Sequence, residues 1–322
     1  MRRDFLKAIA GAGLLAMIAT PAGARKRFAA LDGDIVTLVE MKASAFPFHG
    51  ENPETRELFM NIHDGPRLGH KSPRGGILWE DDTYSDKRTL LALPAGFDLS
   101  KPAALIVFFH GNDCILDRDV IARQHVPGQL AQSNINAVLA APQFAVDARD
   151  SSPGNFWREG FFALWLAEVE RQLAAIHGQG ARAADFARLP VILVAYSGGY
   201  FPAAWVLKQG GAQNRIAGVV LFDALYGDIE KFAEWAEHHH RRAFLFSTFT
   251  KISRTFNLQL QDLLQQRGIG FARDYPASLR PGQIYFGDVP DSVNHVEFLS
   301  EAWTEDPLRW TLERMPAYRR RG

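Results

Sequence analysis

The chain has 322 residues, of which 47% are hydrophobic and 22% are charged. This is the composition of a folded globular protein, and it excludes a disordered chain, a collagen-like repeat and a disulfide-rich miniprotein. Lys plus Arg and Asp plus Glu each number 36, so no basic excess points to nucleic acid. The single Cys, Cys114, excludes an internal disulfide and a zinc site built from cysteines.

Residues 1–24 are expected to form an export signal. A charged start with Arg2 and Arg3 precedes a mildly apolar stretch over residues 8–20, and small residues follow Pro21 as a cleavage site requires. The run Arg-Arg-Asp-Phe-Leu-Lys resembles a twin-arginine signal, which implies export machinery as a partner and a periplasmic or secreted bacterial protein. The apolar stretch is too short for a bilayer, so we expect no stable membrane span in the mature chain.

The body of the chain predicts an α/β fold. Residues 25–74 are treated as an N-terminal extension of uncertain structure, and residues 75–322 as one domain. Apolar runs typical of strands lie at 76–79, 88–93, 104–109, 137–141, 191–195, 216–222, 243–246 and 283–286. Helical patterns lie at 117–132, 162–176, 200–208, 229–237 and 256–266. Buried strands alternating with amphipathic helices indicate a mainly parallel central sheet with helices on both faces.

A serine turn follows the predicted strand at 191–195. The segment Ala195-Tyr196-Ser197-Gly198-Gly199 sits between that strand and a helix. It has the small-x-Ser-x-Gly form of a nucleophile elbow, with Ala195 in place of the commoner first glycine. In such a turn the Ser197 backbone is strained so that the hydroxyl points away from the sheet, and the Gly198 N–H can face a developing oxyanion. A purely structural turn remains the alternative interpretation.

A second segment ends another buried strand and carries a family resemblance. Phe108-Phe109-His110-Gly111-Asn112-Asp113, taken with the serine turn, resembles the α/β-hydrolase family over roughly residues 75–305. The resemblance implies an α/β-hydrolase fold and an oxyanion loop that begins at His110-Gly111. It implies that the second oxyanion N–H comes from Asn112 or Asp113, and that His110 is structural.

The resemblance also implies the other members of a Ser-His-Asp triad. His295 follows the last predicted strand and precedes a helix expected around residues 298–303, which is where the family places its general base. Asp223 directly follows the strand at 216–222, the position of the acid in a minority of the family. Asp228 is the alternative acid, with Asp288 and Asp291 behind it. The order serine, acid, histidine is that of the family.

The remaining candidates concern the pocket and metals. Tyr196, Tyr200, Phe144 and Trp157 are candidates for lining a substrate pocket, with core packing as the alternative. The run at residues 238–240, three consecutive histidines, is more easily explained by its place near a helix C-terminus than by metal binding.

The expected function is an exported serine hydrolase that cleaves a carboxylic ester through an acyl-enzyme, on a small-molecule or lipid-like substrate. This mechanism requires no metal or organic cofactor. Two alternatives stay open: an amidase or peptidase acting on the cell envelope, and a binding protein of the same fold without catalysis. The fold itself does not identify the substrate.

Overall fold

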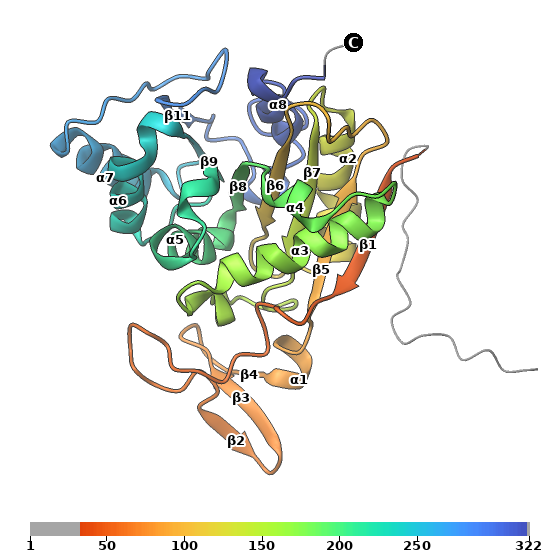
Figure 1. Cartoon of the computed structure of the whole chain (residues 1–322). Helices are drawn as coiled ribbons and strands as arrows, with labels where there is room; N and C mark the ends of the chain where they lie inside the picture. Colours follow the sequence, from red (N-terminus) through yellow and green to blue (C-terminus); the bar gives the residue numbers. More distant parts are fainter. Residues whose placement is uncertain (1–32, 321–322) are drawn as a thin grey trace, which may run out of the picture.

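The computed structural model describes residues 33–320, and its centre is an eight-stranded sheet (Figure 1). The strand order is β1-β5-β7-β6-β8-β9-β10-β11. The strands are β1 (Ile35–Glu40), β5 (Arg88–Leu93), β6 (Ala104–Phe109), β7 (Ala137–Pro142), β8 (Val191–Tyr196), β9 (Ile216–Phe222), β10 (Phe244–Phe249) and β11 (Ile284–Asp288). β5 alone runs opposite to the other seven strands of this sheet, so the sheet is mainly parallel as predicted.

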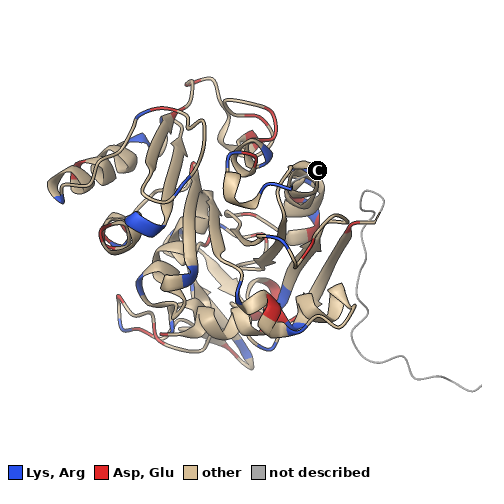
Figure 2. Ribbon diagram, turned by 45° about the horizontal axis from the view of Figure 1, so that its top comes forward, with Lys and Arg blue, Asp and Glu red and all other residues tan. Residues whose placement is uncertain are grey.

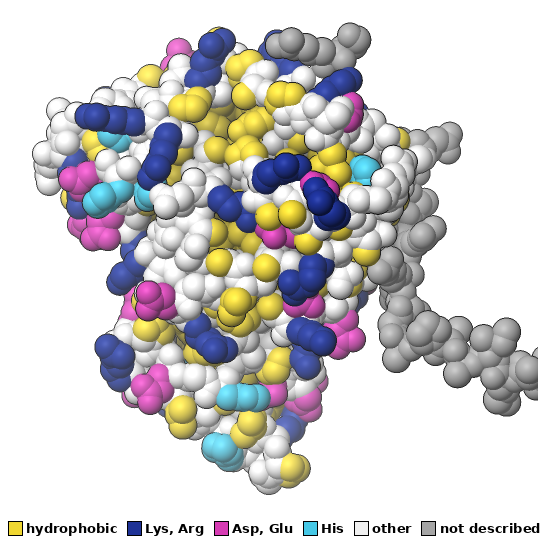
Figure 3. Space-filling view, in the orientation of Figure 1, with side chains coloured by type: hydrophobic (Ala, Val, Ile, Leu, Met, Phe, Trp, Pro, Cys, Tyr) yellow, Lys and Arg dark blue, Asp and Glu magenta, His cyan; other side chains and the backbone are white. Residues whose placement is uncertain are grey.

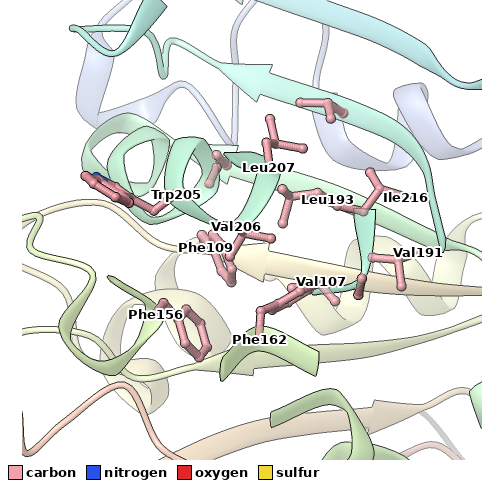
Figure 4. Packing of buried hydrophobic residues seen from close by; sticks show 14 of the residues in the cluster. Val107, Phe109, Phe156, Phe162, Val191, Leu193, Trp205, Val206, Leu207 and Ile216 are labelled. Carbon is pink, nitrogen blue, oxygen red and sulfur yellow. The ribbon is translucent and has the colours of Figure 1, made fainter. Parts of the chain in front are cut away.

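Both faces of the sheet are buried under helices, which explains why its strands are almost continuously apolar. Along β6, Leu105, Val107 and Phe109 face one hydrophobic cluster and the alternate residues face the other. The first cluster contains side chains of four helices, α3 (Phe161–His177), α5 (Tyr200–Gln209), α6 (Ile229–His239) and α7 (Arg254–Gln266). Part of this cluster is shown in Figure 4. The second contains side chains of α2 (Val126–Gln132) and α8 (Pro307–Leu312). Figure 2 shows the central strands mostly without charged residues.

Four of the five helical ranges given above are helices with ends within two residues of the prediction, and three further helices were not predicted. The helices are α1 (Glu80–Thr83), α2 (Val126–Gln132), α3 (Phe161–His177), α4 (Ala183–Ala187), α5 (Tyr200–Gln209), α6 (Ile229–His239), α7 (Arg254–Gln266) and α8 (Pro307–Leu312). No helix between residues 33 and 320 has the length and apolar character that a bilayer crossing requires.

Two helix predictions were wrong. The single helix expected over 117–132 is a π-helical segment, Leu116–Arg123, followed by the separate α2. His125, at φ 50°, interrupts it, and Pro127 opens α2, because a proline ring disrupts the interior of a helix. The helix expected around 298–303 is absent from the described residues there, and the chain instead begins α8 at Pro307, the favoured first position.

Residues 33–74 are not separate from the main sheet. Ile35–Glu40 forms its edge strand, β1, paired along its whole length with β5, so the boundary expected at residue 75 does not divide the sheet. A second sheet of β2 (Ile62–Asp64), β3 (Arg67–Lys71) and β4 (Ile77–Trp79) projects from the body at the bottom of Figure 1. Figure 3, in the same view, shows charged side chains of both signs interspersed over this face.

The small sheet is fixed to the body by aromatic packing. The Phe59 ring stacks on His70 of β3 at a centroid distance of 4.1 Å and packs against Tyr84 and Trp157 at 5.1 and 5.6 Å. Aromatic pairs at these distances contribute stability beyond their buried area. The loop between β3 and β4 is therefore held in a defined place relative to the main sheet.

Candidate active site

The serine turn has the strained geometry that its sequence predicts. β8 ends at Tyr196, and Ser197 begins a short 3-10 helix that leads directly into α5. Ser197 lies at φ 53°, a left-handed conformation that side chains other than glycine rarely adopt. A Cβ at Gly199 would lie 2.3 Å from the Phe109 carbonyl oxygen, so only glycine allows α5 to pack this close to β6. The turn thus presents the Ser197 hydroxyl at the carboxyl edge of the sheet.

His295 lies opposite the serine. The Ser197 hydroxyl is 2.8 Å from His295 Nε2, although 98 residues separate them in the chain. The Tyr196 ring stacks on the His295 ring, and the Tyr196 hydroxyl donates to the His295 carbonyl oxygen at 2.7 Å. Asn294 caps the following turn by accepting from the Val296 N–H at 3.0 Å. These contacts fix the loop that carries the imidazole.

Asp223 completes the constellation. Its Oδ2 lies 2.6 Å from His295 Nδ1, and the carboxylate is fully buried. It also accepts from the Thr250 N–H at 3.0 Å, from the Thr250 hydroxyl at 2.8 Å and from the Ser253 hydroxyl. Burial acts to raise the pKa of Asp223, but the hydrogen bonds from His295, Ser253 and Thr250 outweigh it and hold that pKa below its ordinary value. The carboxylate therefore stays ionised and keeps the Nδ1 proton of His295 in place.

The alternative acids have other partners. Asp228 pairs with Lys231 at the start of α6. Asp288 and Asp291 each lie 2.9 Å from Arg254. Of the four aspartates considered from the sequence, the structure brings only Asp223 within hydrogen-bond distance of His295.

The oxyanion loop distinguishes between Asn112 and Asp113. The Asp113 N–H donates to the Ala148 carbonyl oxygen at 2.9 Å, so the suggestion that it receives an oxyanion is wrong. Within residues 33–320 the Asn112 N–H donates to no such acceptor. The Gly198 N–H lies in the first turn after β8, where backbone N–H groups lack intrahelical partners. Asn112 and Gly198 are therefore the available pair of donors.

His110 has a structural position. Its Nδ1 contacts the Gly111 carbonyl oxygen at 2.7 Å, and its Nε2 accepts from the Phe144 N–H at 2.9 Å. Burial lowers the pKa of His110 to about 4. The neutral imidazole therefore ties the start of the oxyanion loop to the chain after β7, away from proton transfer.

The site opens into a cavity of about 650 Å³. Tyr196 and Tyr200 line it, as does Tyr226, which the sequence did not single out. Phe144 and Trp157 do not line it, and their assignment to the pocket was wrong. Phe144 packs edge-on against Phe109 at 5.1 Å, and both predicted residues are 3% exposed. Phe144 and Trp157 instead pack as large apolar side chains in the hydrophobic core.

The cavity is also lined by arginines that no motif in the sequence singles out. Its charged lining residues are Arg74, Asp113, Arg118, Asp119, Arg123 and Arg149. Arg118 lies 2.7 Å from Asp147, Arg123 lies 2.9 Å from Asp119, and Arg149 lies 3.4 Å from Asp113. Arg74 comes from the loop between β3 and β4 of the small sheet, within the N-terminal extension whose structure the sequence did not predict. Its turn signal, Pro73-Arg74-Gly75-Gly76, was readable, but a turn signal does not say which cavity it faces.

No metal-binding arrangement accompanies the site. Within residues 33–320, no group of three or more His, Cys, Asp or Glu side chains is placed to hold a metal ion. In the run of three histidines, Nδ1 of His238 contacts the Glu234 carbonyl oxygen and Nδ1 of His240 contacts that of Ala236, both at 2.7 Å. These rings are used to cap the end of α6.

Comparison with known proteins gives likenesses of structure only. No protein-family model matches the chain, and no curated protein matches it. Among solved structures, a feruloyl esterase module from Clostridium thermocellum is 12% identical, with a TM-score of 0.47, covering 88% of this chain and 100% of that one. An S-formylglutathione hydrolase from Agrobacterium tumefaciens is 13% identical, with a TM-score of 0.47, covering 90% and 98%. A thermostable esterase from Pseudomonas putida is 10% identical, with a TM-score of 0.44, covering 73% and 80%.

At these identities, and with TM-scores below 0.5, the likenesses say nothing about the reaction of this chain. The fold class is assigned from the sheet of this chain itself. A mainly parallel sheet, helices on both faces and a serine turn after β8 make this an α/β-hydrolase fold.

Proposed function

We propose that the protein is a serine hydrolase that cleaves a carboxylic ester through an acyl-enzyme. One observation carries the proposal: a continuous hydrogen-bonded chain from the Ser197 hydroxyl through His295 to the buried Asp223 carboxylate, at 2.8 and 2.6 Å. A nucleophile bonded to a base that a third group orients is the arrangement that activates a serine.

The reaction proceeds in two halves. Ser197 Oγ attacks the ester carbonyl while its proton passes to His295 Nε2, and Asp223 stabilises the resulting imidazolium. The N–H groups of Asn112 and Gly198 donate to the oxyanion. His295 then gives the proton to the departing alcohol oxygen, which leaves an acyl group on Ser197. In the second half His295 takes a proton from water while the water oxygen attacks the acyl carbonyl carbon. The bond from that carbon to Ser197 Oγ then breaks, which releases the carboxylic acid, and His295 returns the proton to Ser197 Oγ.

Labelling with a fluorophosphonate probe tests the proposal. The probe phosphonylates an activated serine without depending on the identity of the natural ester. We expect one adduct per chain, located on Ser197 by mass spectrometry and absent from the Ser197→Ala variant. A folded protein that takes up no label would contradict the proposal and would favour a binding role for this fold.

We also propose that the chain is exported by the twin-arginine route and acts outside the cytoplasm. The support is the arrangement of residues 1–24, which lie outside the described residues. Replacing both Arg2 and Arg3 with Lys is expected to retain the protein in the cytoplasm of a bacterial host. N-terminal sequencing of the exported wild-type chain is expected to begin at Arg25. Unchanged export of the double variant would contradict this route.

A further inference from the structure

Arg74 is the arginine of the cavity whose charge is not already neutralised. Arg118, Arg123 and Arg149 each lie within 3.4 Å of an aspartate. Within the described part of the chain, Arg74 has no such carboxylate partner. It donates instead to the Asn112 side-chain oxygen at 2.8 Å when the amide is oriented so that both of its ends find hydrogen-bond partners. An anion can therefore reach Arg74 without displacing an existing ion pair.

The position of Arg74 places this charge beside the reacting atoms. The Asn112 amide, oriented so that both ends are satisfied, also donates to the Ser151 hydroxyl at 2.7 Å. A Cβ built on Gly198 would lie 2.6 Å from the end of the Asn112 amide that faces Ser151, which is its nitrogen in this orientation. Arg74 is thus one side chain away from the N–H groups that we assign to the oxyanion, and it shares the cavity with Ser197.

The local sequence holds Arg74 at the tip of the small sheet. The Gly75 N–H donates to the Ser72 carbonyl oxygen at 3.0 Å, and the Ser72 N–H donates to that of Gly76 at 3.1 Å. The Arg74 N–H donates to the Ser72 hydroxyl at 3.2 Å. Gly75 and Gly76 have φ angles of 96° and 80°, which favour glycine. The backbone from which the guanidinium extends is therefore closed by its own hydrogen bonds.

The guanidinium keeps donors free for a ligand. It carries five N–H donors, and the contact with Asn112 uses one of them. A planar fork of this kind matches a carboxylate, which it binds with two parallel hydrogen bonds. Tyr200 lies close enough to feel its charge: burial raises the pKa of Tyr200 to about 12, while Arg74 acts in the opposite direction.

We infer that the ester substrate carries a carboxylate a few atoms from the scissile bond, and that Arg74 binds it. The inference rests on the proposed function, because it names the substrate class of the same site. The carboxylate belongs either to the acyl part or to the alcohol part of the ester. The shared chemistry is an anionic ester, and the experiment separates the two sources.

Two matched pairs of esters test the inference. The acyl-side pair is the 4-nitrophenyl monoester of adipic acid and its terminal carboxamide. The alcohol-side pair is 3-acetoxybenzoate and 3-acetoxybenzamide. For wild-type protein we expect kcat/KM to favour the charged member of one pair by about ten-fold to hundred-fold, the range of a hydrogen-bonded charge pair. Added salt should reduce the preference.

The Arg74→Gln variant should bring that preference close to one, and Arg74→Lys should keep part of it, because the charge remains while the fork is lost. Arg182→Gln is the matched control, since Arg182 is exposed, pairs with Asp185 on α4 and does not line the cavity. It should leave the preference unchanged. Equal loss of activity on both members of a pair in Arg74→Gln would make Arg74 only a positioning residue for Asn112, and would overturn the inference.

Fluorophosphonate labelling separates the two failures. Ser197 labelled at full stoichiometry with no preference for either charged ester overturns the inference and leaves the proposed function standing. No labelling at Ser197 overturns the proposed function itself.

Discussion

His295 Nδ1 donates to Asp223 Oδ2 at 2.6 Å, and the two residues belong to loops at the ends of different strands, 72 positions apart. The same carboxylate is held by Thr250 and Ser253, which follow β10. The acid therefore lies after one strand while its supporting donors lie after the next. This arrangement orients the imidazole through its Nδ1 atom and leaves its Nε2 atom free to face Ser197.

Asp223→Asn is expected to reduce kcat by about a thousand-fold or more, because an amide NH2 facing Nδ1 favours the wrong imidazole tautomer. Asp228→Asn is the matched control, since Asp228 pairs with Lys231 and does not reach His295. It should change kcat less than about three-fold. Steady-state kinetics on an activated ester measure both. Full activity in Asp223→Asn with loss in Asp228→Asn would reverse the assignment of the acid.

Ser253→Ala removes one of the hydrogen bonds that lower the pKa of Asp223. A hydrogen bond to a buried charge contributes about 1.5–3 kcal/mol, so we expect the free energy of unfolding at neutral pH to fall by about that amount. We also expect kcat to fall with it, because the carboxylate is less firmly placed. Urea unfolding and kinetics measure the two effects. Ser85→Ala, which removes an exposed contact with the Asp81 carbonyl oxygen, should change neither.

Gly198 and Gly199 should respond differently to alanine. A Cβ at Gly198 would meet the Ser151 hydroxyl at 2.4 Å and the Asn112 side chain, both of which are able to shift, whereas one at Gly199 would meet backbone. Gly198→Ala should fold and lose about ten-fold or more in kcat/KM through the disturbed oxyanion loop. Gly199→Ala should lower the thermal midpoint strongly or fail to fold. The reverse pattern in thermal scans and kinetics would contradict the assignment of the loop.

Stability should fall in acid because of His110. Burial holds the pKa of His110 in the folded chain at about 4, below the ordinary 6.5. Between these two pH values His110 is therefore protonated in the unfolded chain and neutral in the folded chain. The contribution is complete above pH 6.5 and is lost as the pH falls from 6.5 through 4, by about 3 kcal/mol at most. Urea unfolding over pH 4–8 measures the slope. His110→Gln should flatten it, and an equally steep slope in that variant would assign the effect to other groups.

The main sheet could be predicted closely because its strands are buried on both faces. The ranges 88–93, 104–109 and 216–222 agree with the structure residue for residue, since each contains an apolar run of at least four residues or is apolar throughout. Strand β1 was missed although Ile35, Val36 and Val39 are good strand formers, because its pairing partner lies some fifty residues further on and no local signal links them.

The positions of Ser197, His295 and Asp223 could be selected because each follows a predicted strand, and parallel strands end at the same edge of a sheet. Their contacts are in the structure as that rule suggests. The pocket could not be selected in this way. Tyr196 and Tyr200 line the cavity whereas Phe144 and Trp157 pack away from it, and an aromatic residue type does not encode that difference. Arg74 lies between two strands of the small sheet. The rule that parallel strands end at the same edge of a sheet therefore does not predict its position.

The turn at Ser72–Gly76 bears on how the substrate preference of such a protein can evolve. It is closed by its own hydrogen bonds and lies outside the sheet that strains Ser197. A substitution at Arg74, at the tip of this turn, changes a side chain that lines the cavity. It leaves the positions of Ser197, His295 and Asp223 unchanged. If Arg74 selects the substrate as we propose, selectivity depends on this short turn and reactivity on the main sheet, so a substitution in the turn can change the first without the second.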